Sequence, residues 1–424
     1  MRTIDALRKG WCPGALAPML SGDGYIFRLR LVNGSLSFER AKIFADLARR
    51  YGNGAFDLSA RANLQMRGVG VEDIAPLQAE LAALGLLDSD PRAEAVRNIV
   101  PSPLAGFDPT ALTDARPLVE VLDALLIREK ALHNLPPKFG FSVDGRGVLP
   151  LRGVETDIGF AAFLDDEGPR LRVALGGIVV GSIAPRHFIE TAESLARNFL
   201  RLRVDERRMA ALVARLDATV GVAGLFKNVP IDIEAPQRIL TPLGADKFLG
   251  AQNCGDRSFV GAGLLFGRVE ADALESLVEA AEASGAAALR LTPWRALLAV
   301  GLARKKAEDL ALRLKACGFL LDAADPRLAF TACPGAPACS SALGDVRAVA
   351  LALAPHWRAD AGRVHVSGCV KGCALHGRAL TIVAERDGFS LIENGFARDE
   401  PVVRRLDVAG LQARLAKLST GVRM

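Results

Sequence analysis

The chain carries an internal repeat, and this repeat limits its fold more than any other feature of the sequence. When the sequence is shifted against itself, Asp23 aligns with Asp256, and the match continues without a gap until Gly85 aligns with Gly318. Glycines that recur in register indicate that the same tight turns occur in both copies. The sequence therefore predicts two copies of one structural unit.

Each copy shows the same order of hydrophobic patterns, which predict strand, helix, strand, strand and helix. The expected elements are strand 25–32, helix 37–51, strands 55–58 and 64–69 and a helix ending at Gly85, then strand 259–266, helix 272–284, strands 288–291 and 296–302 and a helix ending at Gly318. Such a unit is a ferredoxin-like half, which covers only one face of its small sheet. Two halves are therefore expected to pair into a pseudo-twofold domain, and the fold class to be α+β.

The segments that follow the two copies are also related. Val100–Pro101 falls on Cys333–Pro334 in the same register, but only the second segment contains cysteine at this place. At roughly 100 to 200 residues per domain, 424 residues allow two to four domains. The expected segments are a ferredoxin-like half at 1–90, an α/β domain without cysteines at 91–240, a second half at 241–325 and an α/β domain with cysteines at 326–424.

The composition excludes several classes of function. Half of the residues are hydrophobic and 24% are charged, which is typical of an ordered globular protein. A net charge of +5 is too small for this length to indicate a nucleic-acid partner. No apolar stretch reaches the roughly 18 residues of a membrane helix, and the N-terminal segment lacks a secretory pattern. We therefore expect a cytoplasmic protein without a membrane partner.

Four of the seven cysteines form two close pairs. Five residues separate Cys333 from Cys339, and three separate Cys369 from Cys373. Four thiolates in loops that contain glycine suit a [4Fe–4S] cluster, in which each iron takes one cysteine sulfur. A structural zinc site is the alternative, but its paired cysteines usually have about two to four residues between them. Disulfides would need an oxidising compartment, which nothing in the sequence indicates.

These features resemble a known superfamily. The cysteine spacing and the duplicated ferredoxin-like half are similar to the nitrite and sulfite reductases, in which a [4Fe–4S] cluster adjoins a sirohaem. Within that superfamily, the stretches RKGWCPGALAPMLSGDG, LPPKFGF, LTPWR and GCVKGCALHG resemble the precorrin-3B synthases of aerobic cobalamin biosynthesis. The resemblance covers nearly the whole chain. It implies that both α/β segments are domains of the reductase type and that the second carries the cluster.

The resemblance also implies residues that bind the carboxylates of a tetrapyrrole. Arg61 matches an arginine that the reductases use in this way, Arg97 and Asn98 match an Arg-Asn pair, and Lys138 matches the lysine of a Leu-Pro-x-Lys-Phe phrase. In the second copy a tryptophan replaces Arg61, and Arg295 follows it as a further candidate. A ligand rich in carboxylates needs fixed cations, whereas an isolated arginine is more often solvated or paired within the protein.

The activity implied by the resemblance is an oxygen-dependent monooxygenase reaction. Precorrin-3A would become precorrin-3B through hydroxylation of C20 with closure of a γ-lactone, using O2 and an external electron donor for which NADH is a candidate. A sirohaem-dependent nitrite or sulfite reductase is the alternative, and it is disfavoured because Gly140 stands where sulfite reductases have a second lysine. No Gly-x-Gly-x-x-Gly motif follows a predicted strand, so the nicotinamide is not expected to bind this chain.

A mononuclear non-haem iron is also implied by the resemblance, and the sequence does not reveal its ligands. His376, three residues after Cys373, and His133, near Lys138, are the candidates among five histidines. A histidine beside a cluster more often donates a hydrogen bond than binds metal. The remaining cysteines, 12, 254 and 317, are expected to be small buried side chains, although Cys12 lies in an unusual Trp-Cys-Pro-Gly loop.

Overall fold

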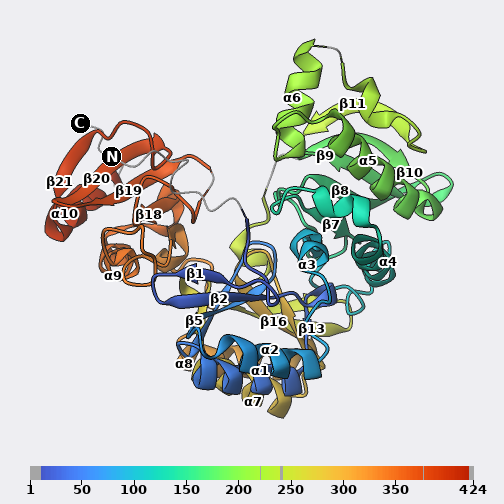
Figure 1. The fold of residues 1–424 in the computed structure, drawn as a ribbon. Coiled ribbons are helices and arrows are strands. Elements are labelled where there is room, and N and C mark those ends of the chain that lie inside the picture. The colour runs from blue at the N-terminus through green and yellow to red at the C-terminus, as the bar shows by residue number, and fades with distance from the viewer. Residues whose placement is uncertain (1–10, 220, 239–241, 376, 420–424) are drawn as a thin grey trace.

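The computed structural model of the protein describes residues 11–219, 221–238, 242–375 and 377–419. The chain forms three lobes (Figure 1). The two repeat copies, drawn in blue and in yellow to orange, lie together at the bottom, and one α/β lobe follows each copy. Within the described part of the chain, no helix is both long and apolar enough to span a bilayer.

The two copies of the repeat build two five-stranded sheets with the orders β1-β2-β5-β4-β14 and β12-β13-β16-β15-β3. The elements of the first copy are β1 (Met19–Ser21), β2 (Gly24–Leu29), β3 (Ser35–Leu36), α1 (Phe38–Tyr51), β4 (Ala55–Leu58), β5 (Leu64–Val69) and α2 (Ile74–Ala83). Those of the second are β12 (Gly250–Cys254), β13 (Arg257–Gly263), β14 (Arg268–Glu270), α7 (Ala271–Ala283), β15 (Ala288–Leu291), β16 (Ala296–Leu302) and α8 (Arg304–Ala316). The predicted duplication and the α+β class are confirmed.

The first strand of each copy ends earlier than predicted. Strand 25–32 stops at Leu29, because the chain turns through Asn33, whose φ is 59°. The second copy makes the same turn at Phe266, with a φ of 54°, so that strand 259–266 stops at Gly263. A left-handed residue breaks the extended backbone, and hydrophobicity alone does not reveal it.

Each copy lends a short strand to the sheet of the other. β3 pairs antiparallel with β15, where Leu36 faces Leu289, and β14 pairs antiparallel with β4, where Val269 faces Phe56. The sequence did not predict this exchange, because strands of two or three residues carry no periodic signal. The exchange joins both halves into one unit.

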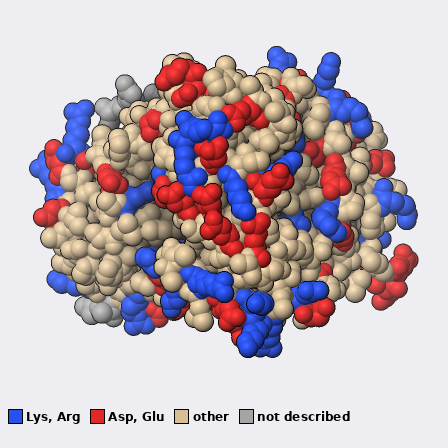
Figure 2. Space-filling view, turned by 90° about the horizontal axis from the view of Figure 1, so that it is seen from below, with Lys and Arg blue, Asp and Glu red and all other residues tan. Residues whose placement is uncertain are grey.

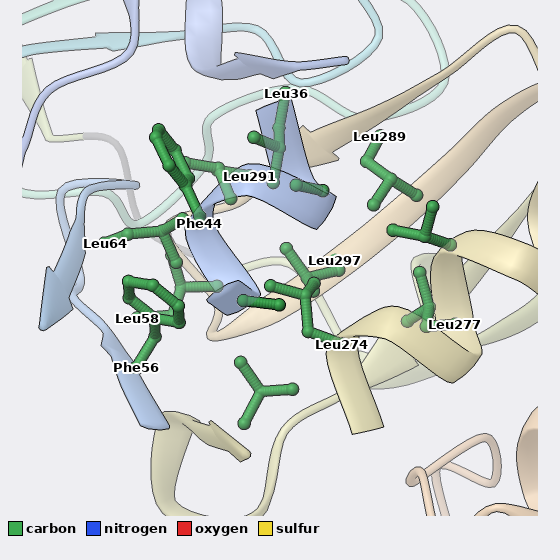
Figure 3. Packing of buried hydrophobic residues seen from close by; sticks show 14 of the residues in the cluster. Leu36, Phe44, Phe56, Leu58, Leu64, Leu274, Leu277, Leu289, Leu291 and Leu297 are labelled. Carbon is green, nitrogen blue, oxygen red and sulfur yellow. The ribbon is translucent and has the colours of Figure 1, made fainter. Parts of the chain in front are cut away.

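One hydrophobic core runs through both halves (Figure 3). Leu36 and Phe44 of the first copy and Leu289 of the second are fully buried, and Leu274 is 1% exposed. Apolar burial contributes about 25 cal/mol per Å² removed from water, so this shared core is the main term that holds the halves together.

The helices of this domain present a mixed charged surface (Figure 2). Lys42 and Glu282 form an ion pair of 2.6 Å between the copies, and Arg49 pairs with Asp272 at 2.7 Å. Exposed pairs of this kind contribute about 0 to 1 kcal/mol each. The face has no extended area of one sign, which is consistent with the small net charge.

The two α/β lobes share one sheet topology. The sheet orders are β11-β10-β9-β8-β7-β6 and β17-β18-β19-β20-β21. In the first lobe β6, β7 and β8 are parallel and β9 is antiparallel to β8. In the second lobe β17, β18 and β19 are parallel and β20 is antiparallel to β19. The first lobe contains α3 (Pro91–Val96), β6 (Ile99–Pro101), α4 (Ala115–Arg128), β7 (Phe141–Asp144), β8 (Ile158–Asp165), β9 (Gly168–Leu175), β10 (Ile178–Ile183), α5 (Phe188–Leu202), α6 (Met209–Thr219) and β11 (Asp232–Arg238). The second contains β17 (Phe330–Ala332), α9 (Val346–Leu353), β18 (Val364–Ser367), β19 (Ala379–Glu385), β20 (Gly388–Gly395), β21 (Val403–Leu406) and α10 (Val408–Ser419). The duplication thus extends over the lobes, while the boundary expected near residue 240 falls on residues 239–241, outside the described ones.

Candidate functional site

The two cysteine pairs follow neighbouring parallel strands. Cys333 comes directly after β17, and Cys369 follows the end of β18, with Ala332 opposite Val366 in the parallel pairing. Since parallel strands end at the same edge of a sheet, the two loops meet there. The Gly368 N–H donates a hydrogen bond of 3.3 Å to the Cys333 Sγ and so joins one loop to the other.

The thiols lie within electrostatic range of one another. Burial raises the pKa of Cys369, and the charges of Cys339 and Cys333 raise it further. Burial also raises the pKa of Cys373, with added repulsion from Cys369 and Cys333. Thiols gathered in this way need a cationic partner in order to ionise together, and an iron–sulfur cluster supplies one iron to each sulfur.

The ferredoxin-like domain clamps the first cysteine loop. Arg67 on β5, whose side chain is 5% exposed, donates to both carboxylate oxygens of Asp23 and, over 2.6 Å, to the Ala338 carbonyl beside Cys339. The Gly22 N–H donates to the same carbonyl over 3.2 Å. A Cβ atom at Gly22 would lie 2.4 Å from a carbonyl oxygen of the loop, so glycine permits this close approach.

Arg295 contacts the second cysteine loop, and its predicted role in binding a ligand carboxylate stays a prediction. Its Nη2 donates to the Ala374 carbonyl over 3.2 Å, directly after Cys373. Burial lowers its pKa, against the opposing effect of Asp57. The backbone φ of Arg295 is 58°, and Ala62 at the equivalent place in the first copy has a φ of 53°.

Three cations lie near the second cysteine loop, and their exposure differs: Arg28 is buried, Arg61 is half-buried and Lys138 is exposed. Arg61 donates from Nη2 to the Lys138 carbonyl over 3.1 Å. Partial desolvation lowers the pKa of Arg61 and of Lys138, and the Arg28 charge lowers both further. Cys373 raises the pKa of Lys138, which places the lysine within range of that thiol. Among the described residues, none of the three cations forms a salt bridge.

Arg28 is the member of this group that the sequence analysis missed. It lies on β2 and is 8% exposed, and neither Nε nor Nη1 has an acceptor among the described residues. A buried cation without a partner costs several kcal/mol, so Arg28 favours an anionic ligand, and Arg61 and Lys138 add positive charge beside it. An arginine within an otherwise apolar strand was the signal available in the sequence.

Arg97 has carboxylate partners within the protein. Its Nε donates to Asp123 over 2.8 Å, and Nη1 pairs with Asp88. Burial lowers the pKa of Arg97, but these two carboxylates outweigh it and raise the pKa. The residue lines a cavity of about 410 Å³ whose lining includes neither Arg61 nor Lys138. The predicted role of Arg97 in holding a ligand carboxylate therefore finds no support in its contacts.

Asn98 positions the loop that carries Lys138. The side chain is 1% exposed, and Nδ2 donates to the carbonyls of residues 137 and 139, on either side of the lysine. A Cβ atom at Gly140 would lie 3.9 Å from the Arg61 Nε and 3.3 Å from the Asn98 carbonyl. The side chain of a lysine at position 140 would thus start beside the Arg61 guanidinium, and glycine leaves this space empty.

The histidine candidates do not form a metal site among the described residues. The His133 Nε2 lies 3.1 and 3.2 Å from the carbonyls of Leu126 and Ile127, so this nitrogen carries a proton and donates. Its Nδ1 lies 3.8 Å from Asp90. His133 is therefore a structural residue, and His376 lies outside the described residues. No three His, Cys, Asp or Glu side chains of the described chain are placed to hold a single metal ion.

Comparison with known proteins agrees with this geometry. Residues 17–84 and 251–317 match the nitrite/sulfite reductase ferredoxin-like half domain, and residues 92–229 match the nitrite and sulphite reductase 4Fe-4S domain. A precorrin-3B synthase of a Sinorhizobium species is 32% identical over 99% of this chain and 90% of its own length. The chain belongs to the precorrin-3B synthase family. It is thus an oxidoreductase-type enzyme of the nitrite and sulfite reductase superfamily.

More distant relatives of this precorrin-3B synthase family member are reductases. A ferredoxin–nitrite reductase of Synechococcus elongatus is 26% identical, over 82% of this chain and 74% of its own length. The structure of the Mycobacterium tuberculosis NirA protein superposes with a TM-score of 0.75 at 20% identity, covering 93% of this chain and 80% of that chain. This second likeness shows a common fold.

The match to the 4Fe-4S domain supports an iron–sulfur cluster in the chain. The matched segment 92–229 contains no cysteine, whereas the lobe with the same strand directions after residue 326 contains four. The lobe without cysteines is thus a copy of this domain that offers no thiol to a cluster. The thiols available for a cluster lie in the second lobe.

Proposed function

We propose that the chain converts precorrin-3A into precorrin-3B with O2, and that Arg28, Arg61 and Lys138 bind the substrate. The observation that carries this proposal is a group of three cations without salt bridges among the described residues, of which Arg28 is buried and lacks an acceptor at Nε and Nη1. A reduced tetrapyrrole with several carboxylates supplies the charge that this group lacks. The family membership favours such a substrate over a small inorganic anion.

Cys333, Cys339, Cys369 and Cys373 would hold a [4Fe–4S] cluster. Their loops meet at one sheet edge, and Gly335 and Gly372, with φ of 73° and 62°, allow the tight turns within them. A bound cluster supplies one-electron transfer. Arg67 and Arg295 fix the loops from the two halves of the ferredoxin-like domain.

The cations would orient the substrate by its rim. A charge-assisted hydrogen bond in a desolvated site contributes about 1.5 to 3 kcal/mol, so three of them select one orientation of the macrocycle. Fixed orientation is itself a large part of catalysis when one carbon of many must react. Asn98 acts on the substrate only through the Lys138 loop that it holds.

The proposed reaction balances with an external donor. One oxygen atom of O2 enters the substrate at C20 as the γ-lactone closes, and the other leaves as water. The donor, for which NADH through a partner protein is a candidate, supplies two electrons, and two protons complete the water. We derive no step through a mononuclear iron, because the described residues offer no ligand set for one.

The test uses holoprotein purified without oxygen. The expected absorption spectrum has a broad iron–sulfur shoulder and no sirohaem bands. With precorrin-3A, a reduced donor and O2, mass spectrometry should detect a product heavier by one oxygen atom. Sirohaem bands together with turnover of nitrite or sulfite would instead establish the reductase alternative.

A further inference from the structure

We infer that Cys12 lines the substrate site and contacts the bound tetrapyrrole. This inference rests on the proposed function and adds a residue to it. Cys12 is not one of the four paired cysteines, and its Trp-Cys-Pro-Gly loop has no other role in the site described above.

The first observation is the position of the Cys12 segment. Residues 12–18 run beside β2, where the Gly14 carbonyl accepts a hydrogen bond of 3.3 Å from the Arg28 N–H. The sulfur of Cys12 lies within electrostatic range of two cations, since its charge raises the pKa of Lys138 and of Arg61. The residue is 9% exposed, so the thiol is buried within the protein.

The segment is held in place by two helices. Both carboxylate oxygens of Glu94 on α3 accept backbone N–H groups, from Ala15 and from Leu16. Gln78 on α2 donates to the carbonyls of the same two residues, each over 3.0 Å. A Cβ atom at Gly14 would lie 2.0 Å from a Glu94 oxygen, so a larger residue there would displace this carboxylate. Hydrogen bonds thus hold the segment directly after Cys12.

The second observation is independent of the thiol and indicates that a ligand belongs here. Arg28 is 8% exposed and leaves Nε and Nη1 without an acceptor among the described residues. Its charge acts on the same two cations as the sulfur of Cys12 does. An anion bound by Arg28 would therefore lie near the Cys12 segment, whose Gly14 carbonyl accepts from the Arg28 N–H.

The two remaining cysteines, Cys254 and Cys317, differ from Cys12 in their surroundings. The Cys254 Sγ donates to the Phe107 carbonyl over 3.7 Å, and Cys317 is exposed after the end of α8. Neither acts on the pKa of Arg61 or Lys138. Cys317 therefore serves as a matched control for Cys12.

The experiment measures the affinity of holoprotein for uroporphyrin, an octacarboxylate tetrapyrrole, by absorbance titration. We expect Cys12→Phe to weaken binding by about tenfold or more, because the ring fills space beside the cations, a loss of about 1.4 kcal/mol. Cys317→Phe should stay within about threefold of the wild type, which is under 1 kcal/mol. Iron and sulfide content should be unchanged in both variants.

A second measurement decides the question even if Cys12→Phe does not fold. Iodoacetamide labelling of the wild-type holoprotein, followed by peptide mass spectrometry, should slow at Cys12 when uroporphyrin is bound and stay constant at Cys317. Equal labelling of Cys12 with and without bound porphyrin, or full affinity of Cys12→Phe, would overturn the inference and leave the proposed function intact. Failure of the wild type to bind uroporphyrin would refute the tetrapyrrole site itself and the inference with it.

Discussion

Replacing Arg67 by leucine should release the first cysteine loop from the ferredoxin-like domain. The guanidinium of Arg67 joins β5 to Asp23, Ser21 and the Ala338 carbonyl, and it is 5% exposed. Leucine keeps much of the volume but removes every donor. The variant leaves the Asp23 carboxylate, whose side chain is 14% exposed, without its bidentate partner.

The size of the effect follows from burial. Removing one partner of a buried ion pair costs about 3 to 5 kcal/mol, because the remaining charge stays desolvated. For a domain of roughly 150 to 250 residues, about 2 to 4 °C of Tm is lost per kcal/mol. We therefore expect the transition of the ferredoxin-like domain to fall by about 6 to 20 °C, and the iron content to fall because the loop with Cys339 loses its anchor.

Arg50→Leu is the matched control. Arg50 also makes a bidentate contact, with Glu80, and a further one with Asp46, but its side chain is 43% exposed. Such a pair contributes about 0 to 1 kcal/mol. Both variants lose a bidentate contact with a carboxylate. Differential scanning calorimetry and iron and sulfide analysis should nevertheless show a lower Tm and iron content for Arg67→Leu than for Arg50→Leu.

Arg67→Lys tests geometry separately from charge. Lysine restores a cation but not the planar fork that reaches Asp23 and the Ala338 carbonyl together, so iron content between wild type and Arg67→Leu is expected. The reasoning would be refuted if Arg67→Leu kept full iron and the Tm of the Arg50→Leu control.

Three further predictions concern the cluster, the substrate and acid stability. Cys339→Ser should lower iron and sulfide per chain, since the cluster would lose one of its ligands, and unchanged iron would reject the assignment. Arg61→Ala should weaken uroporphyrin binding by about 10- to 100-fold, from the roughly 1.5 to 3 kcal/mol of a charged hydrogen bond, while iron content stays constant; equal affinity would remove Arg61 from the site. Hydrogen bonds from Arg50 and Tyr51 lower the pKa of Glu80 to about 2. The folded state then binds fewer protons than the unfolded state between that value and the ordinary carboxyl range, so this contact stabilises at neutral pH and is lost as pH falls toward 2. Glu80→Gln should flatten the acid side of a plot of Tm against pH, and an unchanged slope would contradict this.

The repeat and the cysteine pairs were readable from the sequence because their signals are local. Glycines in register and apolar residues spaced by three or four positions are properties of short windows, and they predicted the helix α7 at Ala271–Ala283 closely, as 272–284. The cysteine pairs were equally clear, because each lies within one loop. The contacts that join the two halves, such as the pairing of β3 with β15, are between residues far apart in the sequence and leave no such local signal.

The roles of individual arginines depended on tertiary partners. Arg97 was predicted to hold a ligand carboxylate, but Asp123, far along the chain, already neutralises it. Arg28 was missed, because an unpaired buried cation is recognisable only when every surrounding group is in place. The sequence shows that a charge exists, and the fold alone decides whether that charge is satisfied.

The exchange of β3 and β14 constrains how such a chain can change over generations. A half that contributes a strand to its neighbour's sheet cannot be deleted without leaving that sheet incomplete, even though the lobe that follows the first half contains no cysteine. The lobe without cysteines is therefore inherited together with the half that precedes it, and it carries Lys138 of the proposed substrate site. Genes split between the two halves should yield active protein only when both fragments are made in the same cell.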